Sequence, residues 1–378
     1  MVLAVGALVA GACSSGTDKA EESNNDSEAE AAVGFAVPGA EWATTDAASA
    51  GLDQAALDEI TAQAEASDSN CFLVARDGEI VEEHYWNGTG AESSQEVFSA
   101  SKSFTATIAG IASDDGAFDT SEPASNYIDE WVGTPSESVT IENLLSNDSG
   151  REQTFETDYV EMAALAENKT EYSINLGQDE APGEKWVYNN AAIQVLEEVI
   201  ERSTGQDMAE LADERLFDPI GMNDTSIIRD NAGNPLTFMG VQSTCRDMAR
   251  FGALALNNGD WDGEEVVSTE WMTDSTGHPS QDLNASYGRL WWLNRPGQIV
   301  NPAEFDENGE PLIQQGQAIV GAPDDLYWAS GLGGQYVIVD PTSGLIVVRL
   351  ADSERNRPVP FGPKEASAVI TEAQVTAE

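Results

Sequence analysis

The chain has 378 residues, and 67 Asp and Glu against 17 Lys and Arg give it a formal net charge of −50. Because nucleic-acid binding depends on Lys and Arg that displace counterions, this acidity argues against a nucleic-acid partner, and two histidines leave little material for a His-built metal site. With 41% hydrophobic residues the chain can still bury a core, in one large mixed domain or in two or three smaller ones.

The N-terminus has the pattern of an export signal. Residues 2–12 form an apolar run that is long enough for a secretory signal but too short to span a membrane, and Cys13 follows directly. Small residues before a cysteine are typical of bacterial lipoprotein processing sites, where the cysteine becomes lipidated. We therefore expect a leader over 1–13 and an exported protein. It is expected to be anchored through Cys13 at the outer face of the cell membrane, or else periplasmic or secreted, and a fortuitous apolar start is the alternative.

The stretch after Cys13 is acidic and rich in Ala, Ser and Asn, and it lacks the apolar periodicity that folding requires. We predict a disordered tether over 14–40, so that the membrane is contacted only through the lipid anchor. Cys71 and Cys245 remain as an even pair in an oxidising compartment. A disulfide between them is predicted, with two buried thiols as the alternative.

The first elements of the fold follow from local patterns. Apolar residues at helical spacing predict a helix over 52–66. Two strand-like runs over 71–75 and 80–86 follow, and they are joined across an Asp-Gly pair, the strongest short-range signal for a hairpin turn. The chain therefore opens with a helix and a hairpin.

The C-terminal end mirrors the beginning, with strands predicted over 335–339 and 345–350 and a closing helix over 366–377. Between the two ends the sequence is mostly helical with long loops. We predict an α/β fold of the α+β kind, in which one antiparallel sheet is built from both chain ends, flanked by helices, beside a mostly helical subdomain. The predicted parts are a catalytic domain over 41–378, with its α/β portion at about 41–112 and 285–378 and its helical portion at about 113–284.

Ser99 and Lys102 stand at the start of a predicted helix. Residues three apart share a helix face, so the Lys102 amine can reach the Ser99 hydroxyl. A serine is a poor nucleophile until a base removes its proton, and a desolvated lysine with a lowered pKa can be that base. Taken alone the pattern is weak, because an N-cap serine and a solvated lysine would look the same.

Two further stretches strengthen the first. Tyr188 and Asn190 lie on a loop before an amphipathic helix, where a tyrosine can relay protons and an asparagine can bind a substrate carbonyl or Lys102. A glycine-rich stretch over 328–335 precedes a strand, where glycines allow a strand edge to approach a ligand closely. A packed aromatic, a helix cap and an ordinary bend are the alternatives.

Together these stretches resemble the motifs of the serine β-lactamase and penicillin-binding-protein superfamily, in the class C β-lactamase-like branch that includes esterases, DD-peptidases and 6-aminohexanoate-dimer hydrolases. The motifs are Ser99-x-x-Lys102, Tyr188-x-Asn190 and Ala329-Ser330-Gly331. The resemblance implies that Ser99 is the acylated nucleophile and that Lys102 and Tyr188 share the acid–base work. It also implies that the Ser99 and Leu332 N–H groups polarise the carbonyl, that Asn190, Ser330 and Gly331 contact the substrate, and that no cofactor takes part.

One position departs from the pattern of β-lactamases and DD-peptidases, which usually carry Lys or His where this chain has Ala329. The cation expected to hold the carboxylate of a penicillin or a stem peptide is therefore missing. We expect a small ester or amide as substrate, with a β-lactamase or DD-carboxypeptidase acting on β-lactams or peptidoglycan peptides as one alternative and a non-catalytic cell-surface binding protein as another. Trp291, Trp292 and Trp328 are expected either to line an apolar acyl or alcohol pocket or to pack in the core.

Overall fold

A computed structural model describes residues 35–305, 311–352 and 361–375. The predicted leader, Cys13 and the tether up to residue 34 lie outside these residues. The end of the predicted tether is described, and Gly39 and Ala40 there accept hydrogen bonds from Arg250, at 2.7 and 2.9 Å. Within the described ranges, no helix combines the length and the apolar character needed to cross a membrane.

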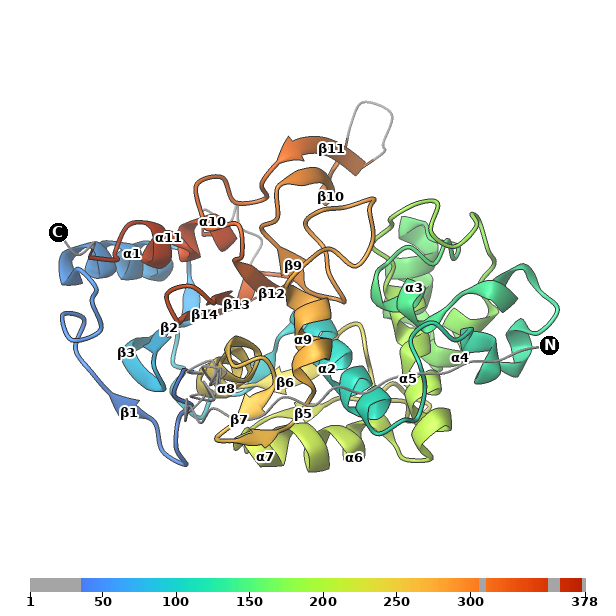
Figure 1. The fold of residues 1–378 in the computed structure, drawn as a ribbon, viewed down its shortest axis with the longest axis horizontal. Helices are drawn as coiled ribbons and strands as arrows, with labels where there is room; N and C mark the ends of the chain where they lie inside the picture. Colours follow the sequence, from blue (N-terminus) through green and yellow to red (C-terminus); the bar gives the residue numbers. More distant parts are fainter. Residues whose placement is uncertain (1–34, 306–310, 353–360, 376–378) are drawn as a thin grey trace, which may run out of the picture. The chain divides into compact units, whose positions relative to one another are not determined.

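A seven-stranded sheet joins the two ends of the chain (Figure 1). Its strand order is β1-β3-β2-β14-β13-β12-β9, and every neighbouring pair is antiparallel except β1 with β3, which makes the sheet mixed. β14 pairs with β2, so strands separated by most of the sequence lie side by side, as predicted. The strands are β1 (Ala43–Thr44), β2 (Ser69–Arg76), β3 (Glu79–Tyr85), β9 (Trp292–Leu293), β12 (Tyr327–Gly331), β13 (Gln335–Asp340) and β14 (Leu345–Ala351).

Local sequence explains the central strands. β13 and β14 are buried along their whole length, which fits their runs of β-branched residues. β2 and β3 are joined at Asp77 and Gly78, whose φ angles of 51° and 75° are those of the tight hairpin turn that an Asp-Gly pair favours. Both predicted strand pairs are therefore confirmed.

Helices cover both faces of the sheet (Figure 1). One face packs against α1 (Gln54–Ala66), which confirms the first predicted helix, and against two short helices, α10 (Pro363–Ala366) and α11 (Ala368–Thr371). The prediction of a single closing helix over 366–377 is therefore wrong, because the structure has two short helices there. The helical run is interrupted at Ser367, whose hydroxyl donates to the Lys364 carbonyl, and the chain after α11 turns back to form a bridge with Leu52.

The other face of the sheet packs against α8 (Cys245–Leu256), and α2 (Ser101–Asp114) lies over the β12 end of the sheet. A disulfide joins Cys71 of β2 to Cys245, the first residue of α8, with 6.5 Å between their Cα atoms. This confirms the predicted pair and fixes one end of α8 to the middle of the sheet. The remaining helices are α3 (Ile141–Leu145), α4 (Lys169–Asn175), α5 (Asn190–Thr204), α6 (Met208–Ala212), α7 (Asp218–Ile220) and α9 (Thr269–Thr276).

Short elements that the sequence did not predict complete the fold. Small antiparallel groups are formed by β4 (Gln95–Glu96), β6 (Val241–Ser243) and β5 (Ser226–Ile227), by β7 (Asp260–Trp261) and β8 (Glu264–Glu265), and by β10 (Gly297–Phe305) and β11 (Pro311–Gly316). The 3₁₀ turns are η1 (Phe98–Ala100), η2 (Ala124–Asn126), η3 (Asp129–Trp131) and η4 (Pro135–Ser138), and the π-helical segments are η5 (Glu156–Leu165) and η6 (Asp213–Phe217).

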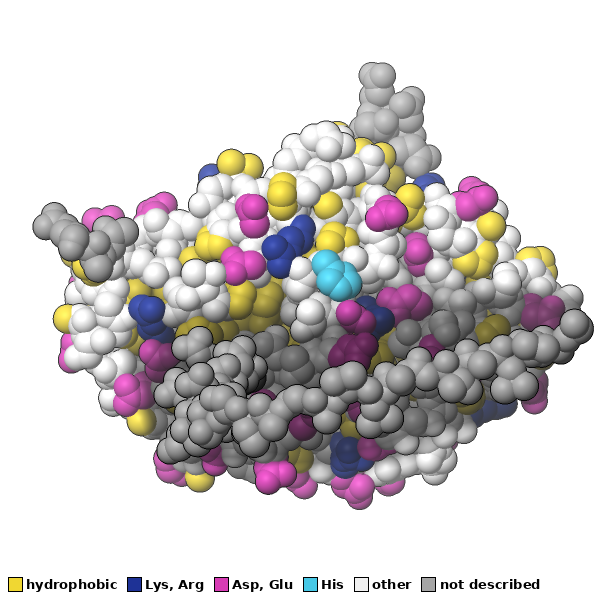
Figure 2. Space-filling model, in the orientation of Figure 1, with side chains coloured by type: hydrophobic (Ala, Val, Ile, Leu, Met, Phe, Trp, Pro, Cys, Tyr) yellow, Lys and Arg dark blue, Asp and Glu magenta, His cyan; other side chains and the backbone are white. Residues whose placement is uncertain are grey.

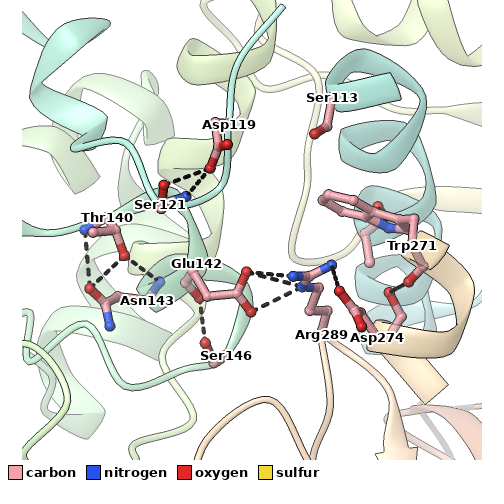
Figure 3. Close-up of polar contacts among 12 residues, drawn as sticks. Ser113, Asp119, Ser121, Thr140, Glu142, Asn143, Ser146, Trp271, Asp274 and Arg289 are labelled. Atoms are coloured by element: carbon pink, nitrogen blue, oxygen red, sulfur yellow. Dashed lines mark hydrogen bonds and ion pairs between the residues drawn. The ribbon is translucent and has the colours of Figure 1, made fainter. Parts of the chain in front are cut away.

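Arg289 ties the region around α3 to α9 (Figure 3). Its guanidinium donates to both carboxylate oxygens of Glu142, each at 3.0 Å from Nε, and lies 3.2 Å from Asp274 through Nη1. It also lies 4.7 Å from the centre of the Trp271 ring. The Arg289 side chain is only 12% exposed. Its charge therefore holds α3 and α9 together and adds little to the charge of the solvent-exposed surface.

Candidate active site

Ser99 lies in η1, the tight turn between β4 and α2. The residue before it, Phe98, has a φ of 48°, in the left-handed region that non-glycine residues rarely adopt. Gly331 at the end of β12 packs directly against this turn, because a Cβ there would lie 2.0 Å from the Val97 carbonyl oxygen. Strand β12 and the nucleophile turn are thus held in contact by a position that only glycine fits.

Lys102, on the first turn of α2, is almost fully buried beside Ser99. Its Nζ lies 3.0 Å from Ser99 Oγ, 2.7 Å from Asn190 Oδ1 and 2.8 Å from the Phe238 carbonyl oxygen. A neutral amine keeps two N–H donors and one lone pair. Since the amide and carbonyl oxygens only accept, the lone pair of neutral Lys102 is directed at the Ser99 hydroxyl.

Burial lowers the pKa of Lys102 to about 7, because the charged ammonium loses its hydration, while the negative charge of Asp158 acts in the opposite direction. An amine with a pKa near neutrality is partly deprotonated at physiological pH. Lys102 therefore has both the geometry and the proton affinity that a general base for Ser99 requires.

Asp158, on η5, is a site residue that the sequence analysis missed. Its carboxylate is fully buried and accepts hydrogen bonds from Asn190 Nδ2 and from the Ala191 N–H, both at 2.8 Å, at the start of α5. This contact orients the Asn190 amide, because its Nδ2 faces Asp158 and its Oδ1 must then face Lys102. No motif surrounds Asp158 in the sequence, and only the fold brings it to Asn190.

Tyr188 lies two residues before α5 and is partly buried in the site. Burial raises the pKa of Tyr188 above its usual value, and a hydrogen bond with Ser99 opposes the rise. The centre of its ring is 4.7 Å from Lys102 Nζ. At neutral pH Tyr188 therefore keeps its proton, so it is suited to donate a proton rather than to remove one.

A cavity of about 520 Å³ opens in front of these groups. Its lining residues are Phe98, Ser99, Tyr159, Ala163, Ala164, Tyr188, Asn190, Phe238, Met239, Trp292, Pro302, Ser330, Gly331 and Leu332. The structure thus brings together Ser99, Tyr188, Asn190 and the predicted residues of the third motif, with Lys102 behind them. None of the described lining residues carries a charge. Tyr159, Phe238 and Met239 were not predicted, because they come from stretches that contain no recognisable motif.

The three tryptophans take different places. Trp292 lines the cavity and stacks on Tyr188, with ring centres 6.0 Å apart. Trp291 is fully buried and stacks on Phe251 in the core. Trp328 packs in the hydrophobic cluster under α1. Trp292 is the first residue of β9, and Trp291 precedes the strand, so of these two neighbours only Trp292 lines the cavity.

Comparisons with known proteins agree with this geometry. Residues 57–369 match the family model described as Beta-lactamase. The chain is 27% identical over 275 residues to a 6-aminohexanoate-dimer hydrolase of Paenarthrobacter ureafaciens, covering 64% of this chain and 69% of that protein. It is 24% identical over 307 residues to a beta-lactamase of Pseudomonas fluorescens, covering 73% and 83%.

A solved structure has a similar fold. It is the putative 6-aminohexanoate-dimer hydrolase from Bacillus anthracis, which superposes with a TM-score of 0.67 at 21% identity and covers 89% of this chain and 87% of that one. At this level of identity the likeness concerns the fold alone. It agrees with the mixed sheet and flanking helices described above.

Proposed function

The chain belongs to the beta-lactamase family of serine hydrolases, and on that premise we propose that it hydrolyses a small, uncharged ester or amide through an acyl-enzyme on Ser99. The observation that carries the proposal is the buried Lys102 amine 3.0 Å from the Ser99 hydroxyl. A lysine held there near neutral pKa activates the serine without a histidine.

In the acylation step, neutral Lys102 removes the Ser99 proton and Oγ attacks the substrate carbonyl carbon. The Ser99 and Leu332 N–H groups stabilise the resulting oxyanion. When the intermediate collapses, the bond to the leaving group breaks and Tyr188 gives that group its proton. The Lys102 ammonium then returns a proton to Tyr188, so that the net transfer is from Ser99 to the leaving group.

Deacylation reverses the roles. Water gives a proton to the Lys102–Tyr188 pair as it attacks the acyl carbon, and the acid product leaves when the bond to Oγ breaks and Ser99 recovers its proton. Asn190 fixes Lys102 in this cycle, and its amide is fixed in turn by Asp158. Asp158 is therefore a positioning residue.

The cavity lining supports an uncharged substrate over a β-lactam or a peptidoglycan peptide. Such compounds carry a carboxylate, and Ala329 stands where a cation would hold it. The described lining contains no cation that could replace it. The likeness to a 6-aminohexanoate-dimer hydrolase supports amides as well as esters among the substrates, but not the absence of charge, because a 6-aminohexanoate dimer is an amide with a free carboxylate.

The test is a hydrolysis panel of p-nitrophenyl butyrate, nitrocefin and a D-Ala-D-Ala peptide, together with labelling by a fluorophosphonate. We expect hydrolysis of the ester and labelling of the wild-type protein, and loss of both in Ser99→Ala. Ser113→Ala, on the same helix but outside the cavity, is the matched control. Labelling of Ser99→Ala at the wild-type level would refute the assignment.

We also propose that the protein is exported and anchored through a lipid on Cys13. The disulfide between Cys71 and Cys245 supports export, because such bonds persist in oxidising compartments. In a bacterial host, the wild-type protein is expected in the membrane fraction and Cys13→Ser in the soluble fraction. Equal partitioning of the two forms would contradict lipidation.

A further inference from the structure

A second cavity of about 350 Å³ adjoins the one in front of Ser99. The two share Tyr159, Tyr188 and Pro302 in their walls, so they form adjacent parts of one cleft. The residues specific to the second cavity are Gln153, Thr154, Phe155, Lys185, Trp186, Val187 and Pro311. We call it the Phe155 cavity.

Four of the ten residues that line the Phe155 cavity are aromatic. The Phe155 ring stacks on Tyr159, with ring centres 5.3 Å apart and planes 22° from parallel, and Trp186 lies 6.4 Å from Tyr188 on the inner side. Phe155 is nevertheless 71% exposed. A large ring held in water costs hydrophobic free energy, and part of that cost would be recovered by covering the ring with an apolar ligand.

The position of Tyr188 decides which half of the substrate reaches this cavity. The acyl carbon is bonded to Ser99 Oγ during the reaction, and its oxygen points to the N–H groups of Ser99 and Leu332. The leaving group must instead lie against the phenol that protonates it. Tyr188 forms the boundary between the two cavities, so a leaving group that touches it extends towards Trp186 and Phe155.

We infer that the Phe155 cavity is a leaving-group subsite that selects esters and amides whose alcohol or amine carries an apolar or aromatic group. This inference rests on the proposed acyl-enzyme function and adds the substrate class to it. It assigns the acyl part to the larger cavity, between Trp292 and Leu332.

Ethyl butyrate and 2-phenylethyl butyrate test the inference, because they form the same butyryl-enzyme and their alcohols have similar basicity. A leaving-group subsite changes only the acylation step, which kcat/KM reports. In the wild-type protein we expect kcat/KM to be about tenfold higher for the phenylethyl ester, the range that one apolar contact provides. In Phe155→Ala we expect the ratio of the two values to fall close to one.

Leu165→Ala is the matched control, because Leu165 lies on the same segment and is 70% exposed but lines neither cavity. Its ratio is expected to equal that of the wild type. The ratio within each variant cancels any change in catalysis that affects both esters. An unchanged ratio in Phe155→Ala would overturn the subsite alone, whereas a wild-type protein that hydrolyses neither ester would overturn the proposed function as well.

Two other outcomes would also overturn the assignment. If Phe155→Ala removes a preference for ethyl hexanoate over ethyl acetate, the cavity holds the acyl chain. Lys185 is the one charged residue among the described residues that line this cavity. If the protein prefers a leaving group with a carboxylate and Lys185→Met abolishes that preference, the cavity recognises charge instead.

Discussion

At the scale of single residues, the site depends on how Lys102 is held. The Asn190 amide oxygen and the Phe238 carbonyl occupy two of its three hydrogen-bonding positions, and both can only accept. Losing a proton therefore leaves the lone pair facing Ser99 rather than another partner. The buried amine therefore presents an unprotonated nitrogen to the Ser99 hydroxyl.

The pH dependence of activity follows from this arrangement. Lys102 acts as a base only when neutral, and its pKa is lowered to about 7, so kcat/KM for p-nitrophenyl butyrate should rise with pH and level off above about 8. Lys102→Met should reduce kcat/KM by about 10² to 10⁴. A wild-type profile that is flat from pH 5 to 9 would exclude Lys102 as the base.

Asp158→Asn tests the role of the buried carboxylate. The groups that face Lys102 are Asp158 and Tyr188, and Tyr188 is protonated throughout this range. Asp158 favours the ammonium, so removing its charge should lower the pKa of Lys102 and move the rising limb of the pH profile to lower pH. The value of kcat/KM on the plateau should fall, because Asn190 loses its fixed orientation.

The control for this change is Glu161→Gln, which removes an acid from the same π-helical segment, where Glu161 pairs with the Tyr172 hydroxyl. Its pH profile should match that of the wild-type protein. If Asp158→Asn lowered activity equally at every pH, the role of Asp158 would be structural only.

The sequence predicted the members of the site that belong to a local pattern. Ser99 and Lys102 are one helical turn apart, and Tyr188 and Asn190 adjoin the start of α5. Within each pair, the two residues are close because they are only a few positions apart in the sequence. Asp158 could not be predicted, because it touches Asn190 across 32 positions of sequence and follows no motif.

At the scale of elements, too, the sequence predicted local pairings and missed pairings between distant short strands. The β2–β3 hairpin and the β13–β14 pair have turn signals between alternating or β-branched runs, and both were predicted. Strands such as β4 and β6 are two or three residues long and pair across more than 140 positions, so nothing local marks them. The pairing of β14 with β2 was predicted only because both chain ends carried strands.

The disulfide gives a prediction at this scale. It closes a loop of 174 residues between β2 and α8, and a bond of this kind contributes about 2–5 kcal/mol to stability. The double variant Cys71→Ser, Cys245→Ser should therefore melt at a lower temperature than the wild-type protein. Reductant should lower the melting temperature of the wild-type protein and leave the variant unchanged. Equal sensitivity of both proteins to reductant would contradict this.

At the scale of the whole molecule, the charge is concentrated on the folded part. Only six of the 67 acidic residues precede residue 35. Several of the 17 cations are removed from the surface, because Lys102, Arg151, Arg250 and Arg349 are each at most 5% exposed. On the face drawn in Figure 2, acidic side chains are scattered over the surface rather than gathered in one patch. Five acidic residues are buried as well, namely Asp148, Asp158, Glu197, Asp247 and Asp340. The surface therefore keeps nearly the whole acidic excess of the sequence.

Salt should therefore stabilise and activate the protein. Repulsion among surface carboxylates is screened as the Debye length falls from about 10 Å at 0.1 M to about 3 Å at 1 M salt. We expect the melting temperature and kcat/KM to rise between 0.1 and 2 M KCl, and sucrose at equal osmolality to reproduce little of the rise. A melting temperature that does not rise with KCl would contradict the claim that repulsion among surface carboxylates destabilises the protein at low salt. The same screening weakens the field that favours the Lys102 ammonium, so the rising limb of the pH profile should move to lower pH in high salt.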